Sequence, residues 1–300
     1  YDVIMAIDAA ARAPFDLAQD RPFRAHLVRR APDDAVLLLV VHHIAGDEWS
    51  AETVFADLAV AYADLAEGRV PDGTPRPQYA DFAVWQRGLA DDPAAAALRD
   101  RDLAFWRSTL AGAPEELALP HDRPRPAVPS HRGGEVYVQV DSELSAALRD
   151  TCARSGASMF MLTHAAVAAL FTALGAGDDI VLGAPVAGRA DSGLEDIVGF
   201  FVDTVALRTD LSGDPDTAEI LTRVRRADLA ALAHQEVPFD EVVDAVGVTP
   251  SLARHPLFQT MVQYRTEPAV PQIGDTTATV SYLSTGTSKF DLTVDFLDAT

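Results

Sequence analysis

The pattern of apolar and polar positions predicts strands and helices that alternate along the whole chain. Residues 35–41, AVLLLVV, form a continuous apolar run of strand length flanked by polar residues, which is typical of a strand buried on both faces. Apolar residues at helical spacing follow this run, with Ser50 as the expected N-cap and Gly68 as the expected stop. The other predicted helices are 79–110, 142–155, 158–174 and 218–233, and the other predicted strands are 135–140, 180–182, 199–207, 258–264 and 290–296.

The segment 114–134 divides this pattern into two parts. It is rich in proline, arginine and glycine, with DRPRP at its centre, and proline disfavours both helices and interior strands, so we predict a linker. Elements alternate on both sides, which predicts an α/β or α+β fold in two lobes, residues 1–125 and 126–300. The chain opens inside a helix-like stretch at Tyr1 and closes shortly after a strand, at Thr300. We therefore expect an excerpt of a longer polypeptide, with both lobes incomplete at their outer ends.

The richest stretch in potential chemistry is 40–50, VVHHIAGDEWS, which ends the predicted buried strand. Consecutive side chains of a strand point to opposite faces, so His42 and His43 are not expected to bind one zinc ion together. The pattern favours one working histidine beside one structural neighbour, because imidazole titrates near neutrality, as acyl transfer requires. The alternative is that hydrogen bonds satisfy both histidines and neither has a chemical role.

Composition and missing motifs exclude several classes of function. The net charge of -21 disfavours nucleic acid and anionic membrane surfaces as partners. Cys152 is the only cysteine, which rules out an internal disulfide and a zinc site built on several thiolates, and fits a reducing cytoplasm. The longest apolar stretch, 159–174, is short for a membrane span. Neither the G-x-S-x-G elbow of serine hydrolases nor a glycine-rich phosphate motif occurs.

The stretch HHIAGDEWS resembles the HHxxxDG signature of condensation domains of non-ribosomal peptide synthetases, which are relatives of chloramphenicol acetyltransferase. Further segments of the family follow in the family's order and cover nearly the whole chain. They are YADFAVWQR (79–87), PEELALPHDRPRP (114–126), GAPVAGR (183–189), DIVGFFVDTVALR (196–208), HQEVPFDEVV (234–243), RHPLFQTMV (254–262) and KFDLTV (289–294).

The resemblance implies a pseudo-dimer of two acetyltransferase-like lobes that meet in a V, with the active site in a tunnel between them. It implies peptide-bond formation, in which an acceptor amine attacks a donor thioester and both groups are carried on phosphopantetheine arms. His43 corresponds to the catalytic residue of the family, and would orient the amine, take its proton or stabilise the tetrahedral intermediate. Asp47 corresponds to a buried structural acid, for which Arg189 is the expected cationic partner.

Two positions depart from the family. Glu48 stands where the family has a glycine, which usually signals a positive φ or a ligand close to the backbone. With Trp49 and Ser50, Glu48 is predicted to line the tunnel, where its carboxylate would lie beside the acceptor amine. Asp203 stands where asparagine is common.

The resemblance also implies the partners of the chain. These are donor and acceptor peptidyl carrier protein domains and the adjacent adenylation domain of the same synthetase, in a cytoplasmic pathway to an antibiotic or other secondary metabolite. The domain itself is expected to bind neither a metal nor a cofactor. HHIAGD, PEELALP and GTSKFDL look most like actinobacterial domains that accept a donor ending in a D-residue. The alternatives are an epimerisation domain and a catalytically silent docking module that recruits a tailoring enzyme.

Overall fold

The computed structural model describes residues 2–74, 76–267, 269 and 272–298. Its contacts form two compact units. Unit 1 comprises Tyr1–Gly88, Arg189–Val202 and Pro268–Thr285, and unit 2 comprises Leu89–Gly188, Asp203–Glu267 and Gly286–Thr300. These units do not coincide with lobes 1–125 and 126–300, whose boundary lies inside unit 2, and the two-lobe division stays a prediction. The predicted truncations at Tyr1 and Thr300 lie outside the described residues.

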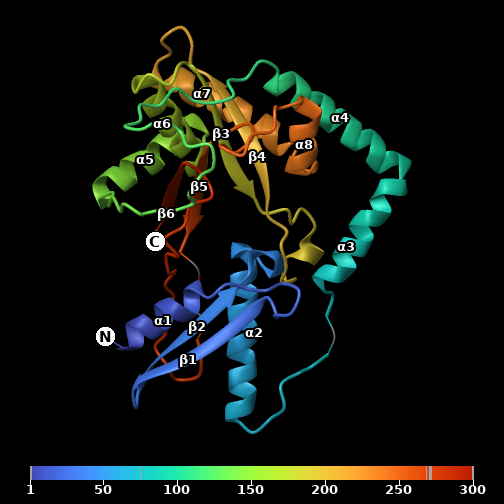
Figure 1. The fold of residues 1–300 in the computed structure, drawn as a ribbon, viewed down its shortest axis with the longest axis vertical. Coiled ribbons are helices and arrows are strands. Elements are labelled where there is room, and N and C mark those ends of the chain that lie inside the picture. The colour runs from blue at the N-terminus through green and yellow to red at the C-terminus, as the bar shows by residue number, and fades with distance from the viewer. Residues whose placement is uncertain (1, 75, 268, 270–271, 299–300) are drawn as a thin grey trace. The chain divides into compact units, whose positions relative to one another are not determined.

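The described part of unit 1 is a β-hairpin with helices (Figure 1). Its elements are α1 (Asp2–Arg12), β1 (Phe23–Ala31), β2 (Asp34–Val41), a 3-10 turn (His43–Ala45), α2 (Glu48–Ala66), α3 (Tyr79–Gly88) and a second 3-10 turn (Ser192–Leu194). The strand predicted at 35–41 is confirmed as β2, which pairs antiparallel with β1, with Phe23 opposite Val41. The prediction that this strand is buried on both faces is wrong. Only Leu38 is buried in β2, and β1 is its only partner strand among the described residues.

The helix predicted over 79–110 is interrupted. Helix α3 ends at Gly88, a 3-10 turn spans Leu89–Asp91, and α4 runs over Pro93–Leu110. Pro93 lacks a backbone N–H and therefore suits only the first turn of a helix. Asp92 caps α4 by accepting a hydrogen bond from the Ala94 N–H, so a new helix begins where the single helix was expected to continue.

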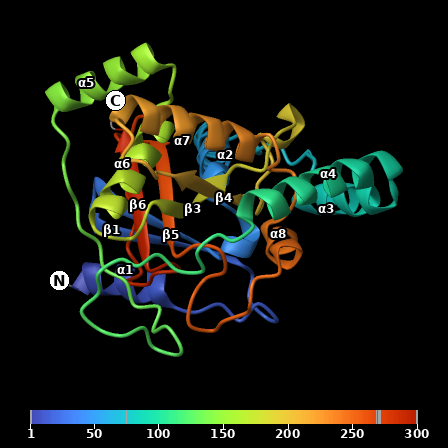
Figure 2. The same ribbon diagram turned by 90° about the horizontal axis from the view of Figure 1, so that it is seen from above.

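Unit 2 contains a four-stranded mixed sheet in the order β4-β3-β5-β6, counted over the described residues (Figures 1 and 2). Strands β3 and β4 are antiparallel, whereas β5 is parallel to both β3 and β6. Helix α6 packs on β5 and α7, α7 packs on β4, and α8 packs on α4. The elements not yet given are β3 (Asp179–Val186), β4 (Asp203–Asp210), β5 (Thr260–Thr266), β6 (Leu292–Asp298), α5 (Ser142–Ser155), α6 (Met159–Ala173), α7 (Thr217–Leu232) and α8 (Phe239–Val246).

The main hydrophobic core lies in unit 2, around β3. This strand, DIVLGAPV, is buried along nearly its whole length, which is typical of a strand covered on both faces. Gly183 is required there, because a Cβ at this position would lie 2.2 Å from the ring of Phe258. Trp106, Leu110 and Phe258 are among the largest fully buried side chains. The mixed α/β class predicted from the sequence is confirmed.

Two further expectations about unit 2 are corrected. The strand predicted at 135–140 is wrong, because this segment pairs with no strand in the described part of the chain and leaves Val136, Tyr137 and Val138 84–91% exposed. The predicted linker, 114–134, contains no helix or strand but packs Leu117 and Leu119 against the core of unit 2. Two elements were not predicted, β1 in unit 1 and α8 in unit 2.

No single helix within the described residues is long and apolar enough to cross a membrane. Helices α5 and α6 meet this criterion only when taken together, and they are bent by 103° at their junction.

Candidate active site

The two histidines of the HHxxxD motif lie in unit 1, just after β2. The strand ends at Val41, and His42 is the N-cap of the 3-10 turn that follows. Its Nδ1 accepts a hydrogen bond from the Ile44 N–H at 3.1 Å, and its ring makes an edge contact with Phe15. His42 therefore has a structural task, because its ring nitrogen holds the turn.

His43 begins this turn and its side chain is exposed. Its Nδ1 lies 3.0 Å from the carbonyl oxygen of Gly46. A carbonyl oxygen only accepts hydrogen bonds, so Nδ1 carries the proton and Nε2 of the neutral ring has a free lone pair. The ring of Phe200 lies against the imidazole, with 4.7 Å between the centroids and 57° between the planes. His43 is thus arranged to accept a proton through Nε2.

The strand argument about the two histidines is wrong in its premise. Alternation along a strand does not apply, because β2 ends at Val41, before both of them. The 3-10 turn gives the histidines different surroundings instead. His42 accepts a hydrogen bond through Nδ1, whereas His43 donates one through the same atom.

Asp47 anchors the helix that follows the turn. It is the N-cap of α2 and forms a capping box with Ser50, the third helical residue, so the expectation of Ser50 as N-cap is wrong. Its Oδ1 accepts hydrogen bonds from the Ser50 N–H at 2.9 Å and from Arg189 Nη2 at 3.1 Å. Its Oδ2 accepts from the N–H groups of Phe201 and Val202, at 2.9 and 3.1 Å. Burial raises the pKa of this carboxyl, but the hydrogen bonds from Ser50, Phe201 and Arg189 outweigh burial and hold the pKa below its ordinary value.

Arg189 is the partner expected for Asp47, and the structure brings the two together. Its guanidinium is buried and also donates through Nη1 to the carbonyls of Leu194 and Ile197, at 2.6 and 2.7 Å. Its Cζ lies 4.1 Å from the centroid of the Phe201 ring, a cation–π contact. The pair is therefore a structural unit that ties the 189–202 segment to the start of α2.

The residues predicted to line the tunnel have different environments. Glu48 and Trp49 are exposed in the first turn of α2. Glu48 has no positive φ, so the backbone needs no glycine at this position on that ground. An acidic residue there also suits the positive end of the helix dipole. Ser50 is only 3% exposed and its hydroxyl lies within hydrogen-bond distance of Asp47 and Gly199, so its side chain belongs to the buried network, and its tunnel-lining role stays a prediction.

Sequence reasoning missed the residues that surround this network. Ser50 Oγ contacts both the N–H and the carbonyl of Gly199, at 3.1 and 3.0 Å. The hydroxyl of Tyr79 donates to the Phe200 carbonyl at 2.9 Å. A Cβ on Gly199 would lie 2.2 Å from the Tyr79 ring, so the glycine is required by close packing. The only sequence signal was the presence of these residues in the motifs YADFAVWQR and DIVGFFVDTVALR.

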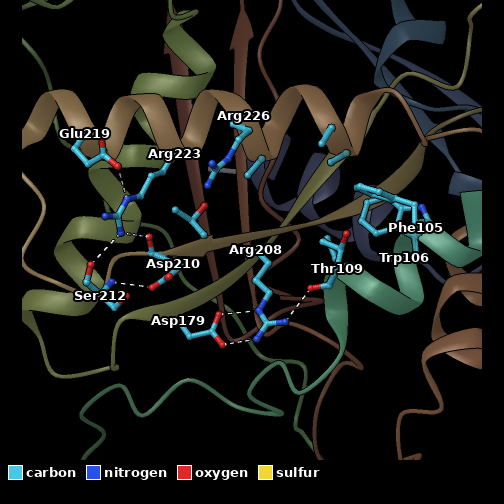
Figure 3. Close-up of a pocket in the computed structure, with 15 residues that line it drawn as sticks. Phe105, Trp106, Thr109, Asp179, Arg208, Asp210, Ser212, Glu219, Arg223 and Arg226 are labelled. Atoms are coloured by element: carbon cyan, nitrogen blue, oxygen red, sulfur yellow. Dashed lines mark hydrogen bonds and ion pairs between the residues drawn. The ribbon is translucent and has the colours of Figure 1, made fainter.

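Unit 2 has its own cavity, of about 860 Å³, between α4, β4 and α7 (Figure 3). Arg208 is held by the carboxylate of Asp179, and Arg223 by that of Glu219. None of the predicted site residues lines this cavity. No group of three or more His, Cys, Asp or Glu side chains in the described ranges is placed to hold a metal ion.

The model of the condensation domain family matches residues 2–299. The chain is 45% identical over 302 residues to a protein described as a probable non-canonical nonribosomal peptide synthetase, CymA, from Salinispora arenicola. The aligned region covers 99% of this chain and 4% of CymA. The chain is 44% identical over 291 residues to a dimodular nonribosomal peptide synthase of Bacillus subtilis, which covers 95% of this chain and 12% of that protein.

The fold of this chain is also similar to that of solved protein structures. The crystal structure of the X-domain from teicoplanin biosynthesis superposes with a TM-score of 0.88 at 35% identity, over 97% of this chain and 66% of that chain. The chain thus spans a small part of the curated synthetases and about two thirds of this solved relative. With the family model matched from residue 2 to residue 299 and the HHxxxD motif in place, the chain belongs to the condensation domain family of nonribosomal peptide synthetases.

Proposed function

We propose that this chain catalyses amide-bond formation between a donor acyl or peptidyl thioester and the amine of an acceptor aminoacyl thioester. The observation that carries the proposal is the state of His43. Its Nδ1 proton is engaged by the Gly46 carbonyl, and its other ring nitrogen has a lone pair on an exposed imidazole. That is the arrangement that a proton acceptor needs.

In the proposed reaction the acceptor nitrogen attacks the thioester carbonyl carbon. An α-amino group has an ordinary pKa of about 8, so a usable fraction is neutral near pH 7 to 8 before any base acts. His43 Nε2 accepts the proton that the nitrogen loses as the tetrahedral intermediate forms. The C–S bond then breaks, and the proton passes to the departing thiolate. Atoms and charge balance, and His43 returns to its starting state.

Asp47 and Arg189 act structurally in this proposal. Their ion pair is buried, and within the described residues neither of its members is hydrogen-bonded to a ring nitrogen of His43. Their task is to fix the start of α2, and with it the turn that carries His43. Removing either charge is expected to affect folding before chemistry.

The partners in this proposal are two peptidyl carrier domains, whose phosphopantetheine arms deliver the substrates, and a neighbouring adenylation domain. Support comes from the relatives, which are synthetases of which this chain spans 4% and 12%. Work within such a synthetase also supports a cytoplasmic location. A donor ending in a D-residue is part of the proposal, and its support is the resemblance of HHIAGD, PEELALP and GTSKFDL.

The test is a single-turnover assay with a loaded donor carrier and a loaded acceptor carrier. We expect amide product with the wild type and a loss of at least 100-fold in His43→Ala, in keeping with general acid–base catalysis. His42→Ala is the matched control, because it removes the adjacent imidazole and is expected to lower stability and solubility first. Equal loss of activity in two well-folded variants would contradict the separate roles of the histidines. A wild type without turnover would favour the silent docking module.

A further inference from the structure

The ring of Phe200 is the only aromatic ring that the structure places against His43 among the described residues. Its centroid lies 4.7 Å from that of the imidazole. Phe200 is 40% exposed, whereas its neighbour Phe201 is 6% exposed and packs against Arg189 and Tyr79. The two phenylalanines therefore have different tasks. Phe201 belongs to the buried interior of unit 1, and Phe200 contributes little to it.

The backbone around Phe200 is held on both sides by side chains. Before it, the N–H and carbonyl of Gly199 both contact Ser50 Oγ. At Phe200 itself, the carbonyl accepts a hydrogen bond from Tyr79. After it, the next two N–H groups donate to Asp47 Oδ2. Such dense anchoring of the backbone on both sides of an exposed side chain fixes the direction in which the Phe200 side chain leaves the chain.

The same carboxylate connects this segment with the turn of His43. Asp47 follows Gly46, whose carbonyl holds His43 Nδ1, and it also caps α2. The turn and the Phe200 segment are thus fixed to one buried group. The ring of His43 is held by a hydrogen bond at Nδ1 and by its tilted contact with the ring of Phe200, which together restrict rotation about χ2, a torsion that is otherwise broad.

We infer that Phe200 is a positioning residue for His43. Its anchored ring restricts rotation of the imidazole, so that Nε2 faces one direction and the Nδ1 proton stays in its hydrogen bond to the Gly46 carbonyl. The inference rests on the catalytic role proposed for His43. Its physical reason is that small errors in the placement of a proton acceptor cost up to about 100-fold in rate.

The first experiment measures His43 directly and needs no turnover. Two-bond ¹H–¹⁵N correlation spectra report the tautomer of His43 and the shifts of its ring protons. In Phe200→Leu we expect changed ring-proton shifts and a mixed tautomer, whereas Phe200→Tyr, which keeps an aromatic ring, retains the wild-type pattern. Phe23→Leu is the matched control, since Phe23 is 43% exposed in the same unit. Unchanged His43 signals in Phe200→Leu would overturn the inference.

The second experiment measures rate and stability. We expect Phe200→Leu to lower kcat about 10- to 100-fold with an unchanged KM for both carriers. The melting temperature of Phe200→Leu should fall by no more than that of Phe23→Leu. Phe200→Tyr should have the kcat of the wild type. A wild-type kcat in Phe200→Leu, where His43→Ala is inactive, overturns the positioning role and leaves the proposed function standing. Full activity in His43→Ala overturns the proposed function, and the spectra of the first experiment still decide whether Phe200 orients the ring.

Discussion

Substitution of Asp47 by alanine tests the buried network most directly. The variant leaves the guanidinium of Arg189 in a site where its side chain is only 5% exposed, without the carboxylate that faces it. Removing one partner of a buried ion pair costs about 3–5 kcal/mol. The lost N-cap of α2 adds about 1 kcal/mol. We therefore expect the free energy of unfolding to fall by about 4–6 kcal/mol.

Chemical denaturation measures this loss, and a double-mutant cycle shows its origin. In Asp47→Ala combined with Arg189→Met no buried charge is left alone, so the double variant should be more stable than Asp47→Ala itself. Amide hydrogen exchange adds a local measure, because the N–H groups of Phe201 and Val202 lose their acceptor and should exchange faster. A loss below about 1 kcal/mol, the range of exposed pairs, would refute the claim that this pair is desolvated.

The pH dependence of the same variant has a defined sign. The folded-state pKa of Asp47 is lowered, so the unfolded state binds the proton more tightly. The stabilisation by this carboxylate is therefore fully present above the unfolded pKa of about 3.9 and is lost as the pH falls through the folded pKa. The difference between wild type and Asp47→Ala should be constant from pH 5 to 8 and shrink only in acid.

Three further predictions concern single positions. Gly199→Ala brings a Cβ to 2.2 Å from the Tyr79 ring and should lower the free energy of unfolding by about 1–3 kcal/mol. Gly88→Ala is the control, because no atom lies within 4 Å of the added Cβ, and it should leave the free energy of unfolding unchanged. Equal denaturation curves for the two variants would contradict this packing. Burial raises the pKa of Asp203, so ionisation of this carboxyl lowers the stability of the folded state. Asp203→Asn should therefore raise the melting temperature at pH 7 and lose this gain below about pH 4. A melting temperature that does not rise at pH 7 would contradict this reasoning. Glu48→Gly should speed condensation with a simple aminoacyl acceptor and leave donor-carrier binding unchanged, because a carboxylate beside the amine stabilises its protonated form. Unchanged turnover in that variant would place Glu48 away from the acceptor.

Elements with a strong local signal were predicted well. Helices α5 and α6 were predicted within one residue of their bounds, because Asp141 and Ser158 cap them and Gly156 separates them. Strands were predicted less well, since a strand depends on its partner as much as on its own sequence. The alternating segment 135–140 finds no partner in the described part of the chain, and β1, FRAHLVRRA, forms a strand although its arginines obscure the alternation.

The candidate site was predicted in part. The HHxxxD motif pointed to His43 and Asp47, and the family resemblance supplied Arg189, which is 142 residues further along the chain. The sequence carries no local mark of that contact. The same holds for Phe200 and Tyr79, whose roles follow from hydrogen bonds and ring contacts between segments about 120 to 155 residues apart.

The assembly of unit 1 from distant segments has a consequence for the time at which the site can form during synthesis. The carboxylate of Asp47 acquires its guanidinium partner only when residues 142 positions later have been made. At about 5–20 residues per second, that delay is roughly 7 to 28 seconds. During this interval the histidine turn lacks the segment whose Phe200 ring contacts His43. A nascent chain stalled before Arg189 should therefore remain open to proteases around α2, whereas one released after Val202 should be protected there.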